Sequence, residues 1–417
     1  MKGNSRLRQI LTPGLIIMLG LAFAAGAQTH PNSTFQPHSE LGRAIDFLWD
    51  RLMLLGTIVF VLVEGALLYV VFRYRGKGNE TSKPPQTHGH AVLEIIWTLI
   101  PAFILIFIAV PTVRVIFETQ AKVPAGALQI EVIGHQWWWE FRYPEYKITT
   151  ANEIYLPVGR TVNFKLNSVD VIHSFWTPQL GGKRDVIANR TNYIWYTPDS
   201  SMKSAVWNGF CTEYCGTSHA KMRFRVFTVQ PAEFASWVAG QQKPAAFGAA
   251  PAPATDAVTP PAVPANGAQL ASMPAGYTFP RNLAEFDYAK PHTPLPGDLS
   301  FTKGLTGIAA KGMQTFSSSA CIGCHMINGN ASAVGNSGPN LTHIGSRSTL
   351  GAGSFPNTPA YLALWIKNAR KMKHGILMPT LGLNEYDPQQ KAQVTKAMGG
   401  LDDQQIADIV AYLSSLK

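Results

Sequence analysis

The residues of this chain best suited to chemistry are a group of potential metal ligands, most of them in one short segment. They combine thiols, imidazoles, a thioether and a glutamate: His173, Cys211, Glu213, Cys215, His219 and Met222. Soft sulfur ligands together with imidazole favour copper. Two cysteines this close together can bridge two metal ions rather than chelate one, and a bridged pair can share an electron with little change in geometry. The pattern therefore indicates an electron-transfer site rather than a site for substrate chemistry.

The chain has only four cysteines, and the second pair forms a different motif. Cys321 and Cys324, followed by His325, make the C-x-x-C-H pattern that attaches c-type haem covalently. The alternative for each pair is a structural disulfide or a zinc site, but structural zinc requires four ligands in one closed cluster. A disulfide would leave His219, Met222 and His325 without a role. Copper and haem together account for every cysteine.

Composition and the first residues indicate an exported protein. Residues 1–27 have a basic start, an apolar stretch and a small-residue end, which predicts a secretory signal peptide cleaved after Ala27. An uncleaved anchor helix is the alternative. The net charge of +10 is spread thinly, with no basic run interleaved with aromatic residues, and this argues against nucleic-acid binding.

Two apolar runs, Leu52–Phe72 and Ile95–Val113, are each long enough to span a bilayer. We expect helices over about 48–73 and 92–117, within a transmembrane hairpin that occupies residues 28–120. The loop between them is basic, so the positive-inside rule places it in the cytoplasm. Everything after the hairpin is then expected outside the membrane, where copper sites and c-type haem are assembled.

The remainder of the chain divides into three parts. Residues 121–238 alternate apolar and polar side chains, which predicts strands of a Greek-key barrel or sandwich with Met222 pointing inward. Residues 239–300 begin with an Ala- and Pro-rich stretch and are expected to form a linker and an arm. Helical periodicity returns over residues 301–417.

Residues 45–238 resemble subunit II of haem–copper cytochrome c oxidases, whose barrel is cupredoxin-like. The aromatic stretch Gly134–Glu140 resembles that of the family, and Trp137 falls at the position where an exposed tryptophan receives electrons. The resemblance implies a binuclear copper centre, CuA. Its ligands would be the backbone carbonyl of Glu213 and the side chains of His173, Cys211, Cys215, His219 and Met222.

The resemblance also suggests roles for acidic residues. The carboxylate of Glu213 would help hold a magnesium ion at the interface with subunit I, a hard ligand for a hard ion. Glu94 would stand at the cytoplasmic entrance of a proton channel, and a solvated helix start is the alternative. Asp170 either positions the loop of His173 or gates electron or water movement, or it only caps a turn. No motif assigns a role to Glu64.

Residues 301–417 resemble a class I cytochrome c domain. Cys321 and Cys324 would form the thioethers to haem c, and His325 would be the proximal iron ligand. The Pro339 carbonyl would orient His325, and Met378, which precedes a proline, would be the distal ligand. The competing candidates for that distal position are His374, Met313, Met326, Met372 and Met398.

Together these features resemble subunit II of a caa-type terminal oxidase with its electron donor fused to it. The fold class expected is a multidomain membrane protein: a two-helix transmembrane hairpin, an all-β cupredoxin-like Greek-key barrel and an all-α class I cytochrome c domain. Electrons would pass from haem c to CuA and on to the haem of subunit I, where oxygen is reduced to water with proton translocation. A tethered donor has a high effective concentration.

The resemblance implies oxidase subunits I and III as partners. The upstream donor would be a quinol–cytochrome c reductase-type complex or a small cytochrome. The location would be the bacterial inner (plasma) membrane, as a multi-pass protein with the CuA and cytochrome c domains on its periplasmic side. The alternatives are a quinol oxidase subunit II, which lacks copper ligands, and a nitric-oxide- or nitrous-oxide-reducing system. A membrane-bound electron carrier or copper-delivery protein acting alone is the alternative outside enzymes.

Overall fold

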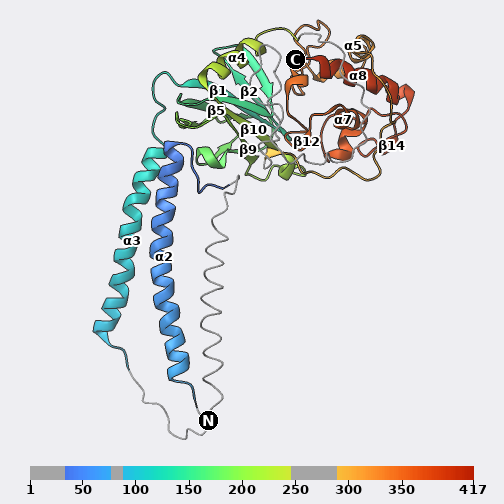
Figure 1. Cartoon of the computed structure of the whole chain (residues 1–417). Helices are drawn as coiled ribbons and strands as arrows, with labels where there is room; N and C mark the ends of the chain where they lie inside the picture. The colour runs from blue at the N-terminus through green and yellow to red at the C-terminus, as the bar shows by residue number, and fades with distance from the viewer. Residues whose placement is uncertain (1–32, 77–87, 246–288) are drawn as a thin grey trace, which may run out of the picture.

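The computed structural model describes residues 33–76, 88–245 and 289–417. Two long helices stand side by side below a β-domain, and a helical domain packs against the side of that β-domain (Figure 1). The predicted signal peptide lies outside the described residues, as does most of the predicted linker. The expected fold class of hairpin, all-β domain and helical domain is confirmed.

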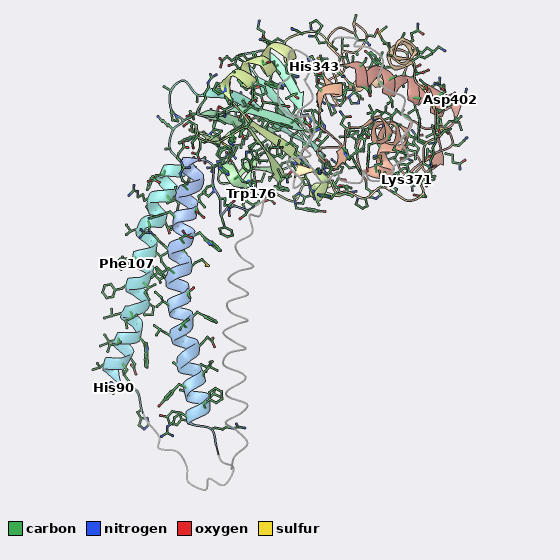
Figure 2. All side chains as sticks on the ribbon, viewed as in Figure 1. His90, Phe107, Trp176, His343, Lys371 and Asp402 are labelled. Carbon is green, nitrogen blue, oxygen red and sulfur yellow. The ribbon has the colours of Figure 1, made fainter. Side chains whose placement is uncertain are left out.

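The hairpin consists of α2 (Glu40–Arg73) and α3 (Ala91–Thr119). Both helices are long and apolar enough to cross a membrane, and most of their large apolar side chains are exposed. Phe107, for example, is 77% exposed and projects outward from α3 (Figure 2). An aqueous environment would make such a surface very unfavourable, whereas bilayer lipid would cover it.

Helix α2 begins at Glu40, ahead of residue 48 where the apolar pattern predicts it. Its first turn contains the charged residues Glu40 and Arg43 beside the buried Leu41, and the Ser39 hydroxyl caps it by accepting a hydrogen bond from the amide of Gly42. The same hydroxyl donates to the Leu180 carbonyl at 2.6 Å, so the start of the helix is attached to the β-domain. The membrane hairpin is therefore joined to the domain above it by direct contacts.

The β-domain is a sandwich of two five-stranded sheets. The first contains, in spatial order, β3 (Ile148–Ala151), β2 (Trp138–Tyr143), β1 (Leu128–His135), β5 (Val162–Ser168) and β8 (Asn192–Tyr196). The second contains β4 (Glu153–Pro157), β10 (Arg223–Val229), β9 (Ala205–Cys211), β6 (His173–Trp176) and β7 (Arg184–Val186). The pairs β1–β5 and β4–β10 are parallel, and the remaining neighbours are antiparallel. Helix α4 (Pro231–Gln241) follows β10.

The helical domain is built on the crossing of α5 (Ala309–Ser317) and α8 (Asp403–Ser415). The two helices approach closely because Gly312 has no side chain: a Cβ there would lie 1.9 Å from the Asp408 carbonyl oxygen. The other elements are α6 (Cys321–Cys324), α7 (Pro359–Met372) and two short hairpins, β11 (Thr349–Leu350) with β12 (Phe355–Pro356) and β13 (Tyr386–Asp387) with β14 (Ala392–Gln393). Single 3-10 turns are η1 (Pro178–Leu180), η2 (His219–Lys221), η5 (Ile344–Ser346) and η6 (Lys396–Met398).

The two extramembrane domains share a continuous apolar contact. Ala369 and Ile376 of the helical domain belong to the same buried cluster as Trp137 and the core of the β-domain. Polar groups flank this contact: the carboxylate of Glu153 on β4 accepts hydrogen bonds from the amides of Ser348 and Thr349, at 2.8 and 2.9 Å. Burial raises the pKa of Glu153, and these donors work against the rise. The domains are therefore docked rather than merely connected by a linker.

Candidate metal and haem sites

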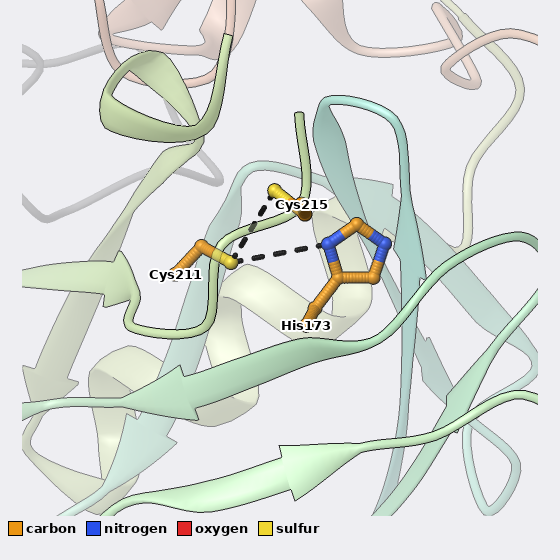
Figure 3. Close-up of side chains that lie close together, drawn as sticks. All are labelled: His173, Cys211 and Cys215. Atoms are coloured by element: carbon orange, nitrogen blue, oxygen red, sulfur yellow. Dashed lines mark hydrogen bonds between the residues drawn. The ribbon is translucent and has the colours of Figure 1, made fainter. Parts of the chain in front are cut away.

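The thiols of Cys211 and Cys215 lie together at one end of the β-sandwich, beside His173 (Figure 3). His173 begins β6 and Cys211 ends the neighbouring strand β9, while Cys215 follows in the next loop. The two sulfur atoms are 3.7 Å apart, and the sulfur of Cys211 is 3.8 Å from Nδ1 of His173. All three side chains are buried. Adjacent strands thus bring together residues that are distant in sequence.

The remaining predicted copper ligands surround the same two sulfur atoms. The sulfur of Cys215 lies 3.6 Å from Nδ1 of His219 and 3.8 Å from Sδ of Met222. The sulfur of Cys211 lies 3.3 Å from the carbonyl oxygen of Glu213. Met222 is fully buried, although it precedes β10 instead of lying within it. Each cysteine is therefore accompanied by one imidazole and one further donor.

The charges of the two thiols fit a bridged metal pair. Hydrogen bonding from Cys215 lowers the pKa of Cys211 to about 4, and donating that proton raises the pKa of Cys215. Metal binding requires both thiols to be deprotonated, and bound cations supply the charge that makes this possible. This donor set is therefore suited to two copper ions.

Asp170 orients the imidazole of His173. One of its carboxylate oxygens lies 2.8 Å from Nε2 of His173, and the other accepts a hydrogen bond from the Gln136 amide at 2.6 Å. Burial would raise the pKa of Asp170, but these hydrogen bonds lower it overall. With Nε2 bonded to a carboxylate, Nδ1 of His173 is left to face the sulfur atoms. This arrangement agrees with the positioning interpretation of Asp170.

Trp137 is covered by the helical domain and is only 8% exposed, in contrast to the exposed tryptophan expected from the resemblance. Its indole nitrogen donates to the carbonyl of Cys215 at 2.8 Å. On its other side the ring contacts Gly375, where a Cβ would lie 2.9 Å from the indole. Trp137 therefore lies between the copper-ligand loop and the helical domain.

A mainly apolar cavity inside the helical domain is lined by Cys321, Cys324 and His325. Nδ1 of His325 lies 2.8 Å from the carbonyl oxygen of Pro339, as the sequence predicts. The preceding Gly338 permits this approach, since a Cβ there would be 2.8 Å from the imidazole. The cavity thus offers two thiols and an oriented imidazole to a flat apolar group, and these residues fit a covalently attached haem.

Met378 lines this same cavity, whereas none of the competing candidates does. Met372 is buried in the domain core, Met313 packs against that core, and Met326 and Met398 are exposed. His374 is exposed as well. The position of Met378 supports its assignment as the distal haem ligand.

We expect Met378→Leu to leave the haem covalently attached but to convert its iron to the high-spin form. Leucine has a similar volume and cannot ligate iron, so the cavity is kept while the thioether is lost. The optical spectrum of the purified oxidase measures this change, with Met398→Leu as the matched control. An unchanged low-spin spectrum in Met378→Leu would assign the distal position to another residue.

Three parts of the chain are similar to known protein families. Three family models match: the transmembrane domain of cytochrome c oxidase subunit II over residues 29–115, its periplasmic domain over 147–229, and cytochrome c over 309–417. The cytochrome c oxidase subunit 2 of Alkalihalophilus pseudofirmus is 30% identical over 385 residues, which cover 90% of this chain and 89% of that protein. The chain belongs to the cytochrome c oxidase subunit II family.

The chain is also similar to two further bacterial proteins. The cytochrome c oxidase subunit 2 of Bacillus sp. PS3 is 30% identical, with 82% of this chain and 79% of that protein covered. The crystal structure of the periplasmic domain of subunit II of cytochrome oxidase from Bradyrhizobium japonicum is 32% identical, covering 29% of this chain and 97% of that one, with a TM-score of 0.28.

Membership of the family has direct consequences. The chain is a subunit of an oxidoreductase complex, associates with other oxidase subunits and carries a cytochrome c domain of its own. The periplasmic domain of subunit II implies copper in the form of CuA, and the cytochrome c domain implies haem. Its soluble domains are anchored by the two apolar helices. The expected cupredoxin-like domain and cytochrome c domain are confirmed.

Glu94 of subunit II lies far from both cofactor sites. It occupies the first turn of α3, at the end of the hairpin remote from the β-domain, next to His90 (Figure 2). Its carboxylate is exposed and accepts a hydrogen bond from the His90 amide at 3.2 Å. Glu64 is partly covered on α2. The fold therefore separates the predicted proton-entry residue from the electron-transfer residues.

Two polar residues near the cofactor sites have no signal in the sequence. Gln136 donates from its amide side chain to the Cys215 carbonyl at 2.8 Å, beside the indole of Trp137. Lys373, at the end of α7, is 2% exposed, and burial lowers its pKa to about 7. A lysine in the last turn of an amphipathic helix ordinarily indicates a solvated cation near the helix C-terminus. Lys373 is buried instead because the β-domain packs against the end of α7.

Proposed function

We propose that this subunit passes electrons from its own haem c to CuA and on to the haem of subunit I, for the reduction of oxygen coupled to proton translocation. When bound, the haem and the copper pair each accept and release one electron, and the protein supplies the ligands and the distance between them. Cys321, Cys324, His325 and Met378 would hold the haem. The thiolates of Cys211 and Cys215 and the four donors around them would hold the copper.

One observation carries this proposal: Trp137 lines the haem cavity and also donates a hydrogen bond to the carbonyl of the copper ligand Cys215. A single buried side chain therefore contacts both cofactor sites. In this proposal the docked cytochrome c domain is the donor of the electrons that enter the copper domain at Trp137. A quinol oxidase subunit II would not need the convergence of sulfur and imidazole donors seen at Cys211 and Cys215.

Metal analysis of the purified complex tests this assignment. We expect two copper ions and one covalently bound haem for each copy of this chain, because both donor sets are complete. Copper is counted by atomic emission, and covalent haem by its absorbance after denaturing electrophoresis. Copper without haem, or a single labile copper ion, would contradict the proposal and favour a copper-delivery protein.

Finer assignments belong to the same proposal. The side chain of Glu213 is exposed while its carbonyl faces Cys211, so the carboxylate is free to bind a second group. It would hold magnesium at the contact with subunit I. Manganese substituted at that position would show an electron paramagnetic resonance signal that Glu213→Ala removes. Glu94 would mark the proton entrance, and loss of proton release from vesicles by Glu94→Gln checks this role.

The surroundings of the subunit complete the proposal. Subunits I and III would be its partners, and a quinol–cytochrome c reductase-type complex or a small cytochrome would reduce its haem. The inner membrane would hold residues 28–120 as the hairpin, with the copper domain at 121–238 and the cytochrome c domain at 301–417 on the periplasmic side. Co-purification of the other subunits with an affinity-tagged copy of this chain checks the partners.

A further inference from the structure

Lys373 is a buried amine at the contact between the two extramembrane domains. It follows α7 and lines the haem cavity together with Trp137, and its side chain reaches toward the copper domain. Burying an ammonium group is costly unless hydrogen bonds replace its water shell. Among the residues that the structure describes, no carboxylate forms an ion pair with Lys373. Its partners must therefore be neutral acceptors.

Three backbone carbonyls supply those acceptors. Nζ of Lys373 lies 2.6 Å from the oxygen of Trp137, 2.9 Å from that of Lys221 and 3.1 Å from that of Gly351. An ammonium group has three donors, and all three are used. The first two acceptors belong to the copper domain, and the third belongs to the helical domain. One side chain thus joins backbone from both domains at a single point.

The two acceptors in the copper domain are those that matter for the proposed electron path. Trp137 is the residue whose indole bonds to the Cys215 carbonyl, and Lys221 lies between the predicted copper ligands His219 and Met222. The Lys221 carbonyl also accepts a hydrogen bond from Ser354 of the helical domain, at 3.3 Å. Displacing either carbonyl would move the tryptophan or the copper-ligand loop relative to the haem cavity.

The residues on either side of Lys373 contact the same loop. The Met372 carbonyl accepts from Nζ of Lys221 at 3.1 Å, and the His374 carbonyl accepts from the Ser218 hydroxyl at 2.6 Å. These two contacts use the backbone of the helical domain, so they persist when the side chain at position 373 changes. Docking as a whole therefore has other support, and the contribution specific to Lys373 is the alignment of Trp137 with the loop.

We propose that Lys373 is a positioning residue that aligns the cytochrome c domain with the copper domain by holding the carbonyls of Trp137 and Lys221. This inference rests on the proposed electron path from haem c to CuA. It adds that the path depends on an amine that ligates neither the copper nor the haem. A neutral side chain of the same length would fill the space without holding the carbonyls.

The test compares Lys373→Met with Lys371→Met in the complete purified oxidase. Lys371 lies two residues earlier, where its ammonium pairs at 2.7 Å with the largely exposed Asp298. The first measurement is the rate of electron transfer from photoreduced haem c to CuA. The second is hydrogen–deuterium exchange of the peptides that contain Trp137 and Lys221, which reports local opening independently of electron transfer.

We expect Lys373→Met to slow the transfer about tenfold or more, since small displacements in a positioned site have large effects on rate. Exchange at the two peptides should rise, while the spectra of the haem and the copper centre stay unchanged. Lys373→Arg, which restores a cation with several donors, should recover part of both losses. Lys371→Met should match the wild type in both measurements.

Equal rates and equal exchange in Lys373→Met and Lys371→Met would overturn the proposal. If Lys373→Met does not assemble, Lys373→Leu, which also lacks a donor, is measured in the same two ways and judged by the same outcomes. If the wild-type complex itself shows no transfer from haem c to CuA, the proposed electron path fails. In that case hydrogen–deuterium exchange by itself tests whether Lys373 positions the two carbonyls. Failure of the electron path and failure of the positioning role are therefore distinguishable.

Discussion

Replacing Cys215 by serine should abolish the near-infrared absorption of the mixed-valence copper pair and stop electron delivery to the oxygen-reducing subunit. The sulfur of Cys215 is within 4 Å of three other predicted donors, those of Cys211, His219 and Met222. A hydroxyl is a poor ligand for copper in place of a soft thiolate. Absorption spectroscopy and copper counting on the purified complex measure the loss.

Tyr214→Phe is the matched control for this substitution. Tyr214 lies in the same loop, next to Cys215, and is 76% exposed, so losing its hydroxyl should leave the copper spectrum intact. Survival of the near-infrared band in Cys215→Ser would show that Cys215 does not bridge the metal ions. The assignment of the loop would then have to be revised.

The second large effect is expected at Trp137. Trp137→Phe keeps an aromatic ring but removes the hydrogen bond from the indole nitrogen to the Cys215 carbonyl. We expect transfer from haem c to CuA to slow by about a hundredfold, a loss typical of a group displaced within a positioned site. Both cofactors should stay bound, since Trp137 ligates neither. Transfer is followed optically after photoreduction of haem c in the purified oxidase.

Trp176→Phe provides the comparison for Trp137→Phe. Trp176 lies on β6 and also donates its indole proton to a backbone carbonyl, that of Gly181 at 3.0 Å. The two variants therefore lose the same kind of hydrogen bond, but only one loses it between the cofactor sites. A transfer rate in Trp137→Phe as fast as in Trp176→Phe would exclude Trp137 from the electron path.

Local spacing was enough to predict most of the copper site. Cys211, Cys215, His219 and Met222 lie in one short loop, so a chain that turns back on itself there must bring their side chains close together. His173 comes from another strand, and its place beside Cys211 depends on the pairing of β6 with β9. Such a pairing is a long-range property, and the family resemblance supplied it.

What the sequence could not predict arises where one domain covers another. Trp137 and Lys373 contact each other although they lie more than two hundred residues apart in the chain. The sequence around each residue does not indicate that the other will cover it. The early start of α2 was missed for a related reason, because charged residues interrupt its first turns and the helix start is attached to the β-domain. Periodicity reports which face of an element is apolar, but it does not report which distant backbone carbonyl that element will contact.

The covering of Trp137 by the cytochrome c domain changes the kinetic order of the step it serves. A soluble donor must first find its acceptor, and charged surfaces make that encounter depend on salt. Here the donor already lies against the acceptor, with the indole of Trp137 enclosed between them. If electrons follow the proposed path, we expect reduction of the copper site to be unimolecular and insensitive to dilution and to ionic strength. If the overall rate depends on dilution or on ionic strength, we attribute that dependence to the earlier collision in which an external donor reduces the haem.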